Sequence, residues 1–188
     1  MMYNRLSFIQ ITDRIKHVAL LLLMTAITVR CEFLRDLTTE PTSRPDATTT
    51  AKSPTADELK LRKEIVNYAQ QYQGVRYRAA GKNPKDGFDC SGFTSYVMNQ
   101  FDIRLSASSQ TQAKQGKFKT IDKVEPGDLI FFRRSPKDSI FHVALVVSNN
   151  RKSLQVIHST SRGVVIDDIL ASEYWRPKID SARDVVHN

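Results

Sequence analysis

The spacing of the hydrophobic residues changes once along this chain, and that change limits the folds open to it. Between residues 58 and 101, large apolar side chains recur at helical spacing in two segments, ELKLRKEIVNYAQQYQG and SGFTSYVMNQF. From residue 128 onward, the runs DLIFFRR, FHVALVVSN, SLQVIHST and GVVIDDI are short, rich in β-branched and aromatic residues, and separated by turn-forming residues. Helices followed by consecutive antiparallel strands predict an α+β domain.

The ends of the two helical segments carry recognisable signals. Asp57 is a suitable N-cap for the first helix, and Gly74 is a natural stop for it. A loop follows through VRYRAAGKNPKDG, which is rich in Gly, Pro, Asn and Asp. Asp89 stands at the start of the second helix, so Cys90 is expected at or just inside a helix N-terminus.

The first 31 residues have the features of an export signal. Positive charges at Arg5, Arg14 and Lys16 precede the apolar run VALLLLMTAITV, which is shorter than the about 20 residues that span a bilayer. Cys31 follows this run and resembles the lipid-acceptor cysteine of bacterial lipoproteins. Arg30 precedes it where both kinds of cleavage site have small residues, so an uncleaved N-terminal anchor stays open. We therefore expect residues 1–31 to be a signal peptide or a lipoprotein-type membrane anchor, and the protein to be exported to the cell envelope, in the periplasm or held at a membrane.

Residues 32–56 are dominated by Thr, Ser, Pro and Ala and have almost no large side chain to bury, which predicts a disordered linker. Residues 57–188 then form a single domain of ordinary size. The net charge of +8 permits attraction to an anionic wall or membrane surface, or is simply a solvated basic surface. No dense basic block interleaved with aromatic residues occurs, so nucleic acid is not an expected partner.

The chain has two cysteines, Cys31 and Cys90, and Cys90 has no obvious disulfide partner if Cys31 is removed or modified. A lone cysteine is often an inert buried residue. A helix N-terminus, however, stabilises a thiolate and lowers the thiol pKa from its free value of about 8.5. Gly92 also leaves space for a substrate backbone to approach. These features favour a nucleophile at Cys90.

Two of the four histidines, His142 and His158, lie on successive expected strands and can supply the base. His142 shares a strand face with Ala144, which leaves room for a cleft. If Ser148 pairs with Lys152 in the hairpin, His142 lies directly opposite His158, near enough for one imidazole to orient the other. A slip of one residue would place His158 on the other face. Cys90, His142 and His158 then form a nucleophile, a base and an orienting group.

The chain resembles the NlpC-type family of bacterial cell-wall peptidases, which are papain-like cysteine enzymes. The matching segments occur in the family's order between Tyr68 and Tyr174: GVRYRAAG, GFDCSGF, LSASSQTQ, PGDLIFF, HVALVV and IHST. The resemblance implies a papain-like fold, with N-terminal helices packed on a C-terminal antiparallel β-sheet. It also implies hydrolysis of peptidoglycan stem peptides or muropeptides, most often between γ-D-glutamate and the diamino acid, by a D,L-endopeptidase that needs no metal or organic cofactor.

Site residues follow from the same resemblance. Cys90 matches the family's nucleophile, His142 its base, His158 its third polar residue and Tyr77 a tyrosine that helps to stabilise the oxyanion. Further matches are Asp89 and Ser91, which line the substrate site in some members, and Ser109 and Gln112, which are substrate-binding or structural. The chain departs from the family pattern at Ser106 and Ala107, where Pro-Arg is usual, and at Ala80, where glycine is usual. These departures leave the substrate preference open.

Three other interpretations remain at this point. The same Cys-His pair serves amidases and acyltransferases of related papain-like folds on cell-envelope substrates. A catalytically silent wall-binding module is an alternative of a different class. Zinc binding by Cys90, His142 and His158 is a third, although the sequence lacks a closely spaced ligand pair such as Cys-x-x-Cys.

Overall fold

A computed structural model describes residues 54–150 and 152–187 of the chain. The expected export segment or anchor (1–31), its Cys31 and nearly all of the expected linker (32–56) lie outside the described residues. Within the described ranges, no helix combines the length and hydrophobicity that crossing a membrane requires. The elements begin with helix α2, Ala56–Gln70, and end with strand β8, Ile179–Asp184.

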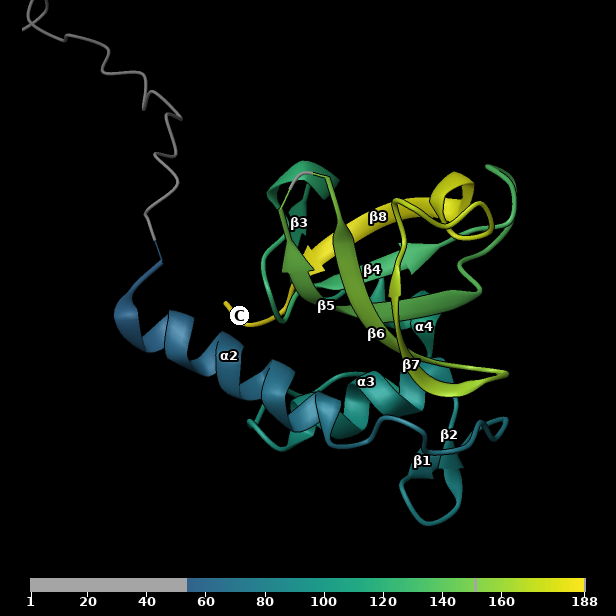
Figure 1. Ribbon diagram of the computed structural model, residues 1–188, viewed down its shortest axis with the longest axis horizontal. Helices are drawn as coiled ribbons and strands as arrows, with labels where there is room; N and C mark the ends of the chain where they lie inside the picture. The colour runs from purple at the N-terminus through teal and green to yellow at the C-terminus, as the bar shows by residue number, and fades with distance from the viewer. Residues whose placement is uncertain (1–53, 151, 188) are drawn as a thin grey trace, which may run out of the picture. The chain divides into compact units, whose positions relative to one another are not determined.

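Two helices lie along one side of the sheet (Figure 1). Helix α2 is capped by Thr55, whose hydroxyl accepts a hydrogen bond from the Glu58 N–H at 3.3 Å. The expected cap at Asp57 is therefore wrong: Asp57 lies in the first turn, where its negative charge favours the helix N-terminus without capping it. Gly74 closes the turn after α2 with a φ of +84°, which glycine adopts readily. The second helix, α3, spans Cys90–Asn99 and has Asp89 as its N-cap, as expected.

The sheet has six antiparallel strands in the order β3-β8-β4-β5-β6-β7. The four expected strands are present, as β4 (Leu129–Phe132), β5 (His142–Asn149), β6 (Leu154–Thr160) and β7 (Gly163–Asp168). Two strands of this sheet were not expected: β3, Lys117–Lys119, and β8, which inserts between β3 and β4. The short elements are β1 (Lys82–Asn83), β2 (Gly87–Phe88), α4 (Ser109–Gln112) and two 3₁₀ turns, Ile121–Lys123 and Arg176–Lys178.

The hairpin of β5 and β6 is shifted from the register expected from sequence. Leu145 pairs with Ile157, and an irregularity between Val146 and Ser148 adds one residue to β5. Continued along the strands, this register places Ala144 rather than His142 opposite His158. The shift is by two residues, so both histidines still lie on one face of the sheet.

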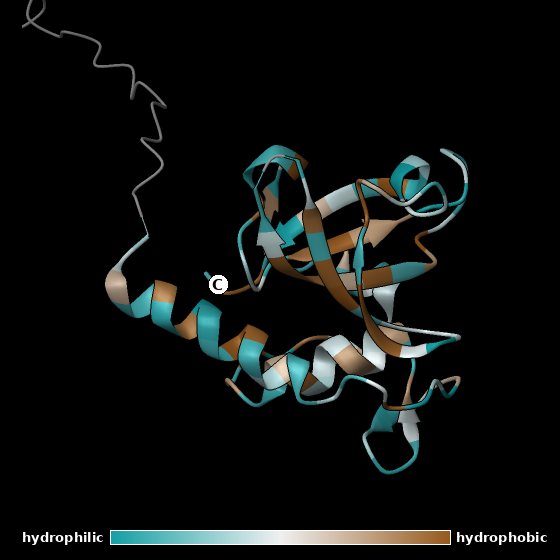
Figure 2. Cartoon of the chain, viewed as in Figure 1, coloured by the Kyte–Doolittle hydropathy of each residue, from teal (hydrophilic) through white to brown (hydrophobic). Residues whose placement is uncertain are grey.

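Both faces of the sheet are covered by hydrophobic residues. One face packs against α2 and α3 through a core that includes Ile65, Phe93, Val97, Val143 and Leu145. The other face, which carries His142, is closed by a second core that includes Phe132, Ala144, Val156, Ile169 and Trp175. Figure 2 shows the result, with β5 hydrophobic over most of its length and α2 alternating in polarity. The open cleft expected beside Ala144 is thus mostly filled, and the end of this face near His142 borders a pocket.

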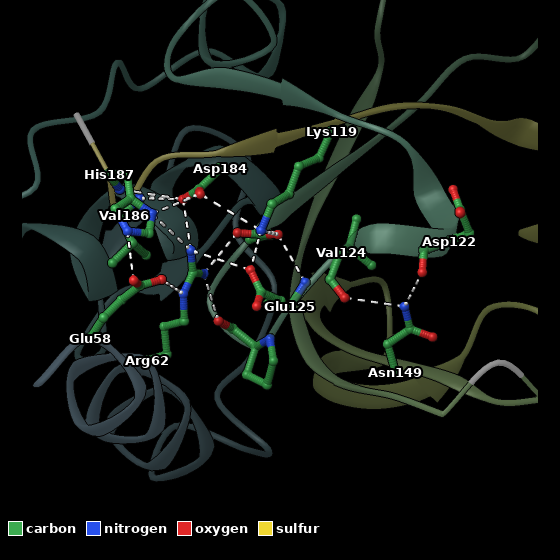
Figure 3. A network of polar contacts seen from close by, with 12 residues as sticks. Glu58, Arg62, Lys119, Asp122, Val124, Glu125, Asn149, Asp184, Val186 and His187 are labelled. Carbon is green, nitrogen blue, oxygen red and sulfur yellow. Dashed lines mark hydrogen bonds and ion pairs between the residues drawn. The ribbon is translucent and has the colours of Figure 1, made fainter. Parts of the chain in front are cut away.

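A buried ionic cluster joins α2 to the far end of the sheet (Figure 3). The Arg62 side chain is almost fully buried and contacts the Glu58 carboxylate at 2.9 Å, Asp128 at 2.8 Å and Asp184 at 2.9 Å. Lys119 contacts Asp128 and Asp184, at 3.1 and 3.6 Å. Because these residues come from α2, β3, the turn before β4 and the end of β8, the cluster fixes the helix against the sheet.

Candidate active site

Cys90 is the first residue of α3 and is a half-buried free thiol. The Asp89 carboxylate caps the helix by accepting hydrogen bonds from the Gly92 N–H at 2.6 Å and the Ser91 hydroxyl at 3.1 Å. The Ser91 hydroxyl also lies 3.0 Å from the carbonyl oxygen of Ala107. Asp89 and Ser91 therefore hold the start of α3 and its neighbouring loop, and neither lines the pocket beside Cys90.

Gly92 does not leave room for a substrate, contrary to the expectation from sequence. A Cβ atom at this position would lie 2.0 Å from the carbonyl oxygen of Gly81. The residue is buried, and the loop before β1 occupies the space that a side chain would fill. Glycine is needed here so that this loop can pack against the helix that carries Cys90.

Cys90 and His142 line the same pocket, which has a volume of about 700 Å³. His142 is the first residue of β5 and pairs with Phe132 of β4. The backbone N–H of Val143, the next residue, forms a hydrogen bond to the Cys90 sulfur. The N-terminus of α3 and the start of β5 are therefore adjacent, and the pocket opens over both. Its other walls come from Tyr77, Arg134 and Phe141, from the ends of β6 and β7 with the turn between them, and from the segment 172–175.

The His142 imidazole is held by a hydrogen bond at one ring nitrogen and by stacking against an aromatic ring. Nε2 of His142 lies 3.0 Å from Nδ1 of His158. The Trp175 ring stacks on the imidazole, with 4.7 Å between centroids and 27° between planes. Because Nε2 is engaged with His158, Nδ1 is the ring nitrogen left for the pocket. Sequence reasoning missed Trp175, since nothing in the spacing of this residue, which follows β7, connects it with His142.

His158 is fully buried and has a second polar partner that the sequence reasoning also missed. Its Nε2 lies 3.0 Å from the Oδ2 atom of Asp167 on β7, and Arg162 forms an ion pair with the same carboxylate. Both ring nitrogens of His158 are thus engaged in hydrogen bonds, one with His142 and one with Asp167. Among the described residues, no group of three or more His, Cys, Asp or Glu side chains is arranged to hold a metal ion.

Burial keeps the three catalytic candidates uncharged at neutral pH. Burial, together with the neighbouring His158, lowers the pKa of His142 to about 3. Burial also lowers the pKa of His158, although the Asp167 carboxylate acts in the opposite direction. Burial raises the pKa of the Cys90 thiol, and the Asp89 charge adds to this, while the N–H groups of Val143 and Ser91 only partly oppose it. The pKa of Cys90 expected from its helix N-terminus was therefore wrong in direction, because desolvation outweighs the helix dipole.

Tyr77 lies at the rim of the pocket and is about half exposed. Its backbone forms a parallel bridge with Phe88, two residues before Cys90, which brings the phenol to the thiol side of the pocket.

Ser109 and Gln112 do not line the pocket. Gln112 is buried, and its side chain bonds the Thr94 hydroxyl at 2.9 Å and the carbonyl oxygen of Ser91 at 3.1 Å. It supports α3 from behind. Ser109 is the half-buried first residue of the single-turn helix α4.

Comparisons with known proteins agree with this architecture. The model of the NlpC/P60 family matches residues 74–184. The chain is 34% identical over 138 residues to the gamma-DL-glutamyl hydrolase of Bacillus subtilis (strain 168), a match that covers 72% of this chain and 31% of that protein. It is also 34% identical over 128 residues to the murein DD-endopeptidase MepS/murein LD-carboxypeptidase of Escherichia coli (strain K12), covering 67% of this chain and 64% of that one. The matches thus span less than two thirds of both relatives.

Solved structures show the same fold. An NlpC/P60 family protein from Bacillus cereus ATCC 10987 superposes with a TM-score of 0.61 at 29% identity, covering 66% of this chain and 40% of that chain. The papain-like arrangement of helices on an antiparallel sheet is therefore confirmed. The chain belongs to the NlpC/P60 family.

Proposed function

We propose that this protein is a cysteine endopeptidase that hydrolyses peptidoglycan stem peptides at the bond between γ-D-glutamate and the diamino acid. The observation that carries the proposal is the pocket shared by Cys90 and His142, in which His142 Nδ1 is the unengaged ring nitrogen. The B. subtilis relative is named a gamma-DL-glutamyl hydrolase, which supports the choice of bond. The E. coli relative is named a DD-endopeptidase, so the bond has to be tested directly.

The first step is acylation of the thiol. Cys90 is a neutral thiol and His142 a neutral imidazole, so Nδ1 takes the thiol proton as the sulfur attacks the carbonyl carbon of the scissile amide. The imidazolium that forms then gives this proton to the leaving amine. The carbon–nitrogen bond breaks and a thioester to Cys90 remains. Because both groups are neutral at rest, the protein acts here as a general-base system and does not store a thiolate.

The tetrahedral intermediate carries a negative oxygen that needs hydrogen-bond donors. The backbone N–H of Cys90 at the start of α3 and the Tyr77 hydroxyl are the donors that we assign to it. The Tyr77 hydroxyl is well suited, because a phenol is protonated at neutral pH and can donate a hydrogen bond. In the second step, His142 Nδ1 takes a proton from water, which hydrolyses the thioester and regenerates the thiol.

The charges of the pocket favour a substrate that carries a carboxylate. Four charged residues line it, and three are engaged: Arg162 and Asp167 pair with each other, and Asp168 accepts backbone N–H groups, among them that of Leu170 at 3.0 Å. Arg134 has its guanidinium 4.2 Å from the Phe141 ring centroid and takes part in none of the acidic contacts of the described residues. A γ-linked D-glutamate presents a free α-carboxylate next to the scissile bond, and Arg134 is the residue that we assign to it.

Digestion of defined muropeptides, read by mass spectrometry, tests the proposal. The substrates are a disaccharide tripeptide and a cross-linked dimer, and the proteins are the parent, Cys90→Ala and, as a control, Cys31→Ala. We expect the parent and Cys31→Ala to yield a disaccharide dipeptide and a diamino acid with a new free amine, and Cys90→Ala to yield neither. Conversion of the dimer to intact monomers would instead indicate a D,D-endopeptidase.

Three other results would overturn the proposal altogether. Separation of the whole stem peptide from the sugar would indicate an amidase, and a peptide joined to an added amine would indicate an acyltransferase. Equal processing by the parent and Cys90→Ala, or none by either, would favour a wall-binding module without catalysis.

We also propose that the enzyme acts outside the cytoplasm, with residues 1–31 as a signal peptide or lipid-linked anchor, residues 32–56 as a linker and residues 57–188 as the peptidase domain. The basic and apolar pattern before Cys31 supports this. Labelling of cells with a fatty-acid analogue tests the lipid: the parent should carry the label and Cys31→Ala should not. An unlabelled parent that is found in the soluble envelope fraction would instead indicate a cleaved secretory signal.

A further inference from the structure

A chain of hydrogen bonds runs behind His142 and ends at a charged pair. His142 Nε2 lies 3.0 Å from His158 Nδ1, and His158 Nε2 lies 3.0 Å from Asp167 Oδ2. Arg162, in the turn between β6 and β7, forms an ion pair with that carboxylate. This series of hydrogen bonds thus extends beyond the two histidines to Asp167, which has no role in the proposed mechanism.

The protons of this chain can be placed by donor and acceptor matching. An ionised carboxylate only accepts hydrogen bonds, and Asp167 stays ionised because His158 and Arg162 outweigh its partial burial and lower its pKa. His158 must then carry its proton on Nε2, which leaves Nδ1 as an acceptor. His142 must carry its own proton on Nε2 in order to donate to that acceptor. The one remaining lone pair is on His142 Nδ1, which is the nitrogen that the proposed mechanism uses as a base.

Burial makes this arrangement of protons strongly preferred. His158 is fully buried and His142 is 7% exposed. The opposite tautomer of one ring alone would place two protons or two lone pairs between the rings, and an unmatched buried polar group costs about 1–3 kcal/mol. Reversing both rings would match them again but would place a bare His158 Nε2 against the Asp167 carboxylate. The carboxylate is therefore the group that decides between the two matched arrangements.

We propose that Asp167, held by Arg162, is a positioning residue that sets the tautomer of His158 and, through it, the tautomer of His142. This inference rests on the proposed function for its kinetic consequence only. Apart from each other, the titratable and charged groups that face the two rings in the described residues are Asp167 from β7, Arg162 from the adjoining turn, and Cys90 in the shared pocket. The other rings against them are uncharged and belong to Phe132, Phe141 and Trp175. Asp167 is the only carboxylate among all these groups.

The tautomers can be read directly by NMR, whether or not a substrate is known. Long-range proton–nitrogen spectra of the full-length protein labelled with ¹⁵N-histidine separate protonated from unprotonated ring nitrogens. In the parent and in a surface control, Glu64→Gln, we expect both His142 and His158 to be protonated on Nε2. In Asp167→Leu, which has no acceptor, we expect the opposite tautomers to appear in both rings together. Asp167→Asn, which keeps an acceptor oxygen, should lie between the two.

Kinetics then test whether the tautomer matters for the reaction. Loss of the correct tautomer should lower kcat by about tenfold or more in Asp167→Leu while KM changes by less than about twofold. The acid limb of the pH profile should move to lower pH, because the lost negative charge no longer favours protonated His142. In a His158→Asn background, Asp167→Leu should lower kcat by less than about twofold, since the residue through which Asp167 acts is gone.

The outcomes separate the inference from the proposed function. Unchanged tautomers of both rings in Asp167→Leu would overturn the inference, as would an equal loss of kcat with and without His158. Thermal unfolding of each variant shows whether it is folded. If Asp167→Leu does not fold, Asp167→Ala is a second variant that lacks an acceptor. Shifted tautomers in a protein whose parent cleaves no muropeptide would sustain the placement of protons and contradict the endopeptidase.

Discussion

Nε2 of His142 lies 3.0 Å from Nδ1 of His158, although the two residues do not pair directly across β5 and β6. The register that pairs Leu145 with Ile157 offsets the two histidines by two positions on one face, and their side chains lean toward each other across the diagonal. Trp175 packs against both rings, with centroids 4.7 and 5.0 Å away. The imidazole that we propose as the base is thus held on several sides before any substrate arrives.

The protonation state of Cys90 can be checked by alkylation. Burial raises the pKa of this thiol, so its neutral form predominates at neutral pH and above the ordinary thiol pKa of about 8.5. In a Cys31→Ala background, where Cys90 is the sole cysteine, the iodoacetamide rate should be low at neutral pH and should rise only above this value. The same protein unfolded in urea should titrate near the ordinary value. Rapid alkylation that is independent of pH down to about pH 5 would show a stored thiolate–imidazolium pair instead.

Arg134 should determine the preference for a free carboxylate in the substrate. The test compares stem peptides whose γ-linked D-glutamate has a free α-carboxylate with stem peptides in which this carboxylate is replaced by an amide. The parent should favour the carboxylate by about tenfold in kcat/KM, as one charge-assisted hydrogen bond allows, and Arg134→Gln should lose this preference. Lys137→Gln, an exposed charge change on the same loop, is the control and should keep it. An undiminished preference in Arg134→Gln would exclude this role.

The buried cluster around Arg62 should contribute strongly to stability. Arg62→Met leaves Glu58, Asp128 and Asp184 without their common partner, and loss of one member of a buried ion pair costs about 3 kcal/mol or more. Lys60→Met, which removes an exposed charge 3.9 Å from Glu64, should change the free energy of unfolding by less than about 1 kcal/mol. Urea denaturation measures both. Similar values for the two variants would mean that the cluster adds little.

The same cluster sets a dependence of stability on pH. Burial of Asp184 would raise its pKa, but the hydrogen bond from His187 and the charges of Arg62 and Lys119 outweigh burial and lower the pKa to about 2. A carboxyl with a depressed folded pKa stabilises the protein above its unfolded value of about 3.9. This contribution should be lost as the pH falls from about 4 to about 2, and the loss should be smaller in Asp184→Asn. An identical pH dependence in both proteins would argue against it.

Ala80 occupies a backbone conformation that glycine adopts more easily. Its φ is +56°, in the left-handed region, where a side chain costs about 1–2 kcal/mol. Ala80→Gly should therefore raise the free energy of unfolding by about 1 kcal/mol, after the entropy that glycine loses on folding. The neighbouring Ala79 has no positive φ, so Ala79→Gly should have the opposite sign. Urea denaturation of the two variants decides whether they differ in this way.

Helical spacing of apolar residues was sufficient to predict the helices, and short β-branched and aromatic runs were sufficient to predict the four central strands, of which β4 and most of β5 are buried on both faces. Neither pattern could predict β8, since the sequence IDSARD has no alternation of hydrophobic residues and forms a strand only between β3 and β4. The hairpin register also escaped prediction, because one extra residue near Val147 changes the pairing without any change in the hydrophobic pattern.

The site residues divide in a similar way. Cys90 and His142 were predicted from their residue types and their places on expected elements, and the structure puts both in one pocket. Asp167 could have been found from the tight turn between Thr160 and Gly163, which puts Val165 opposite His158 and Asp167 on the same face. The direction of the Cys90 pKa could not, because it depends on how deeply the fold buries the thiol, and a sequence does not state the depth.

The most direct test of the whole account is the mass of the protein during turnover. Rapid acid quenching of the parent with a disaccharide tripeptide should trap a thioester, seen as the added mass of the acyl part of the substrate on the peptide that contains Cys90. His142→Ala and Cys90→Ala should show no such adduct. Cleavage by the Cys90→Ala protein, or steady turnover by the parent with the adduct on another residue, would contradict the assignment of Cys90 as the nucleophile.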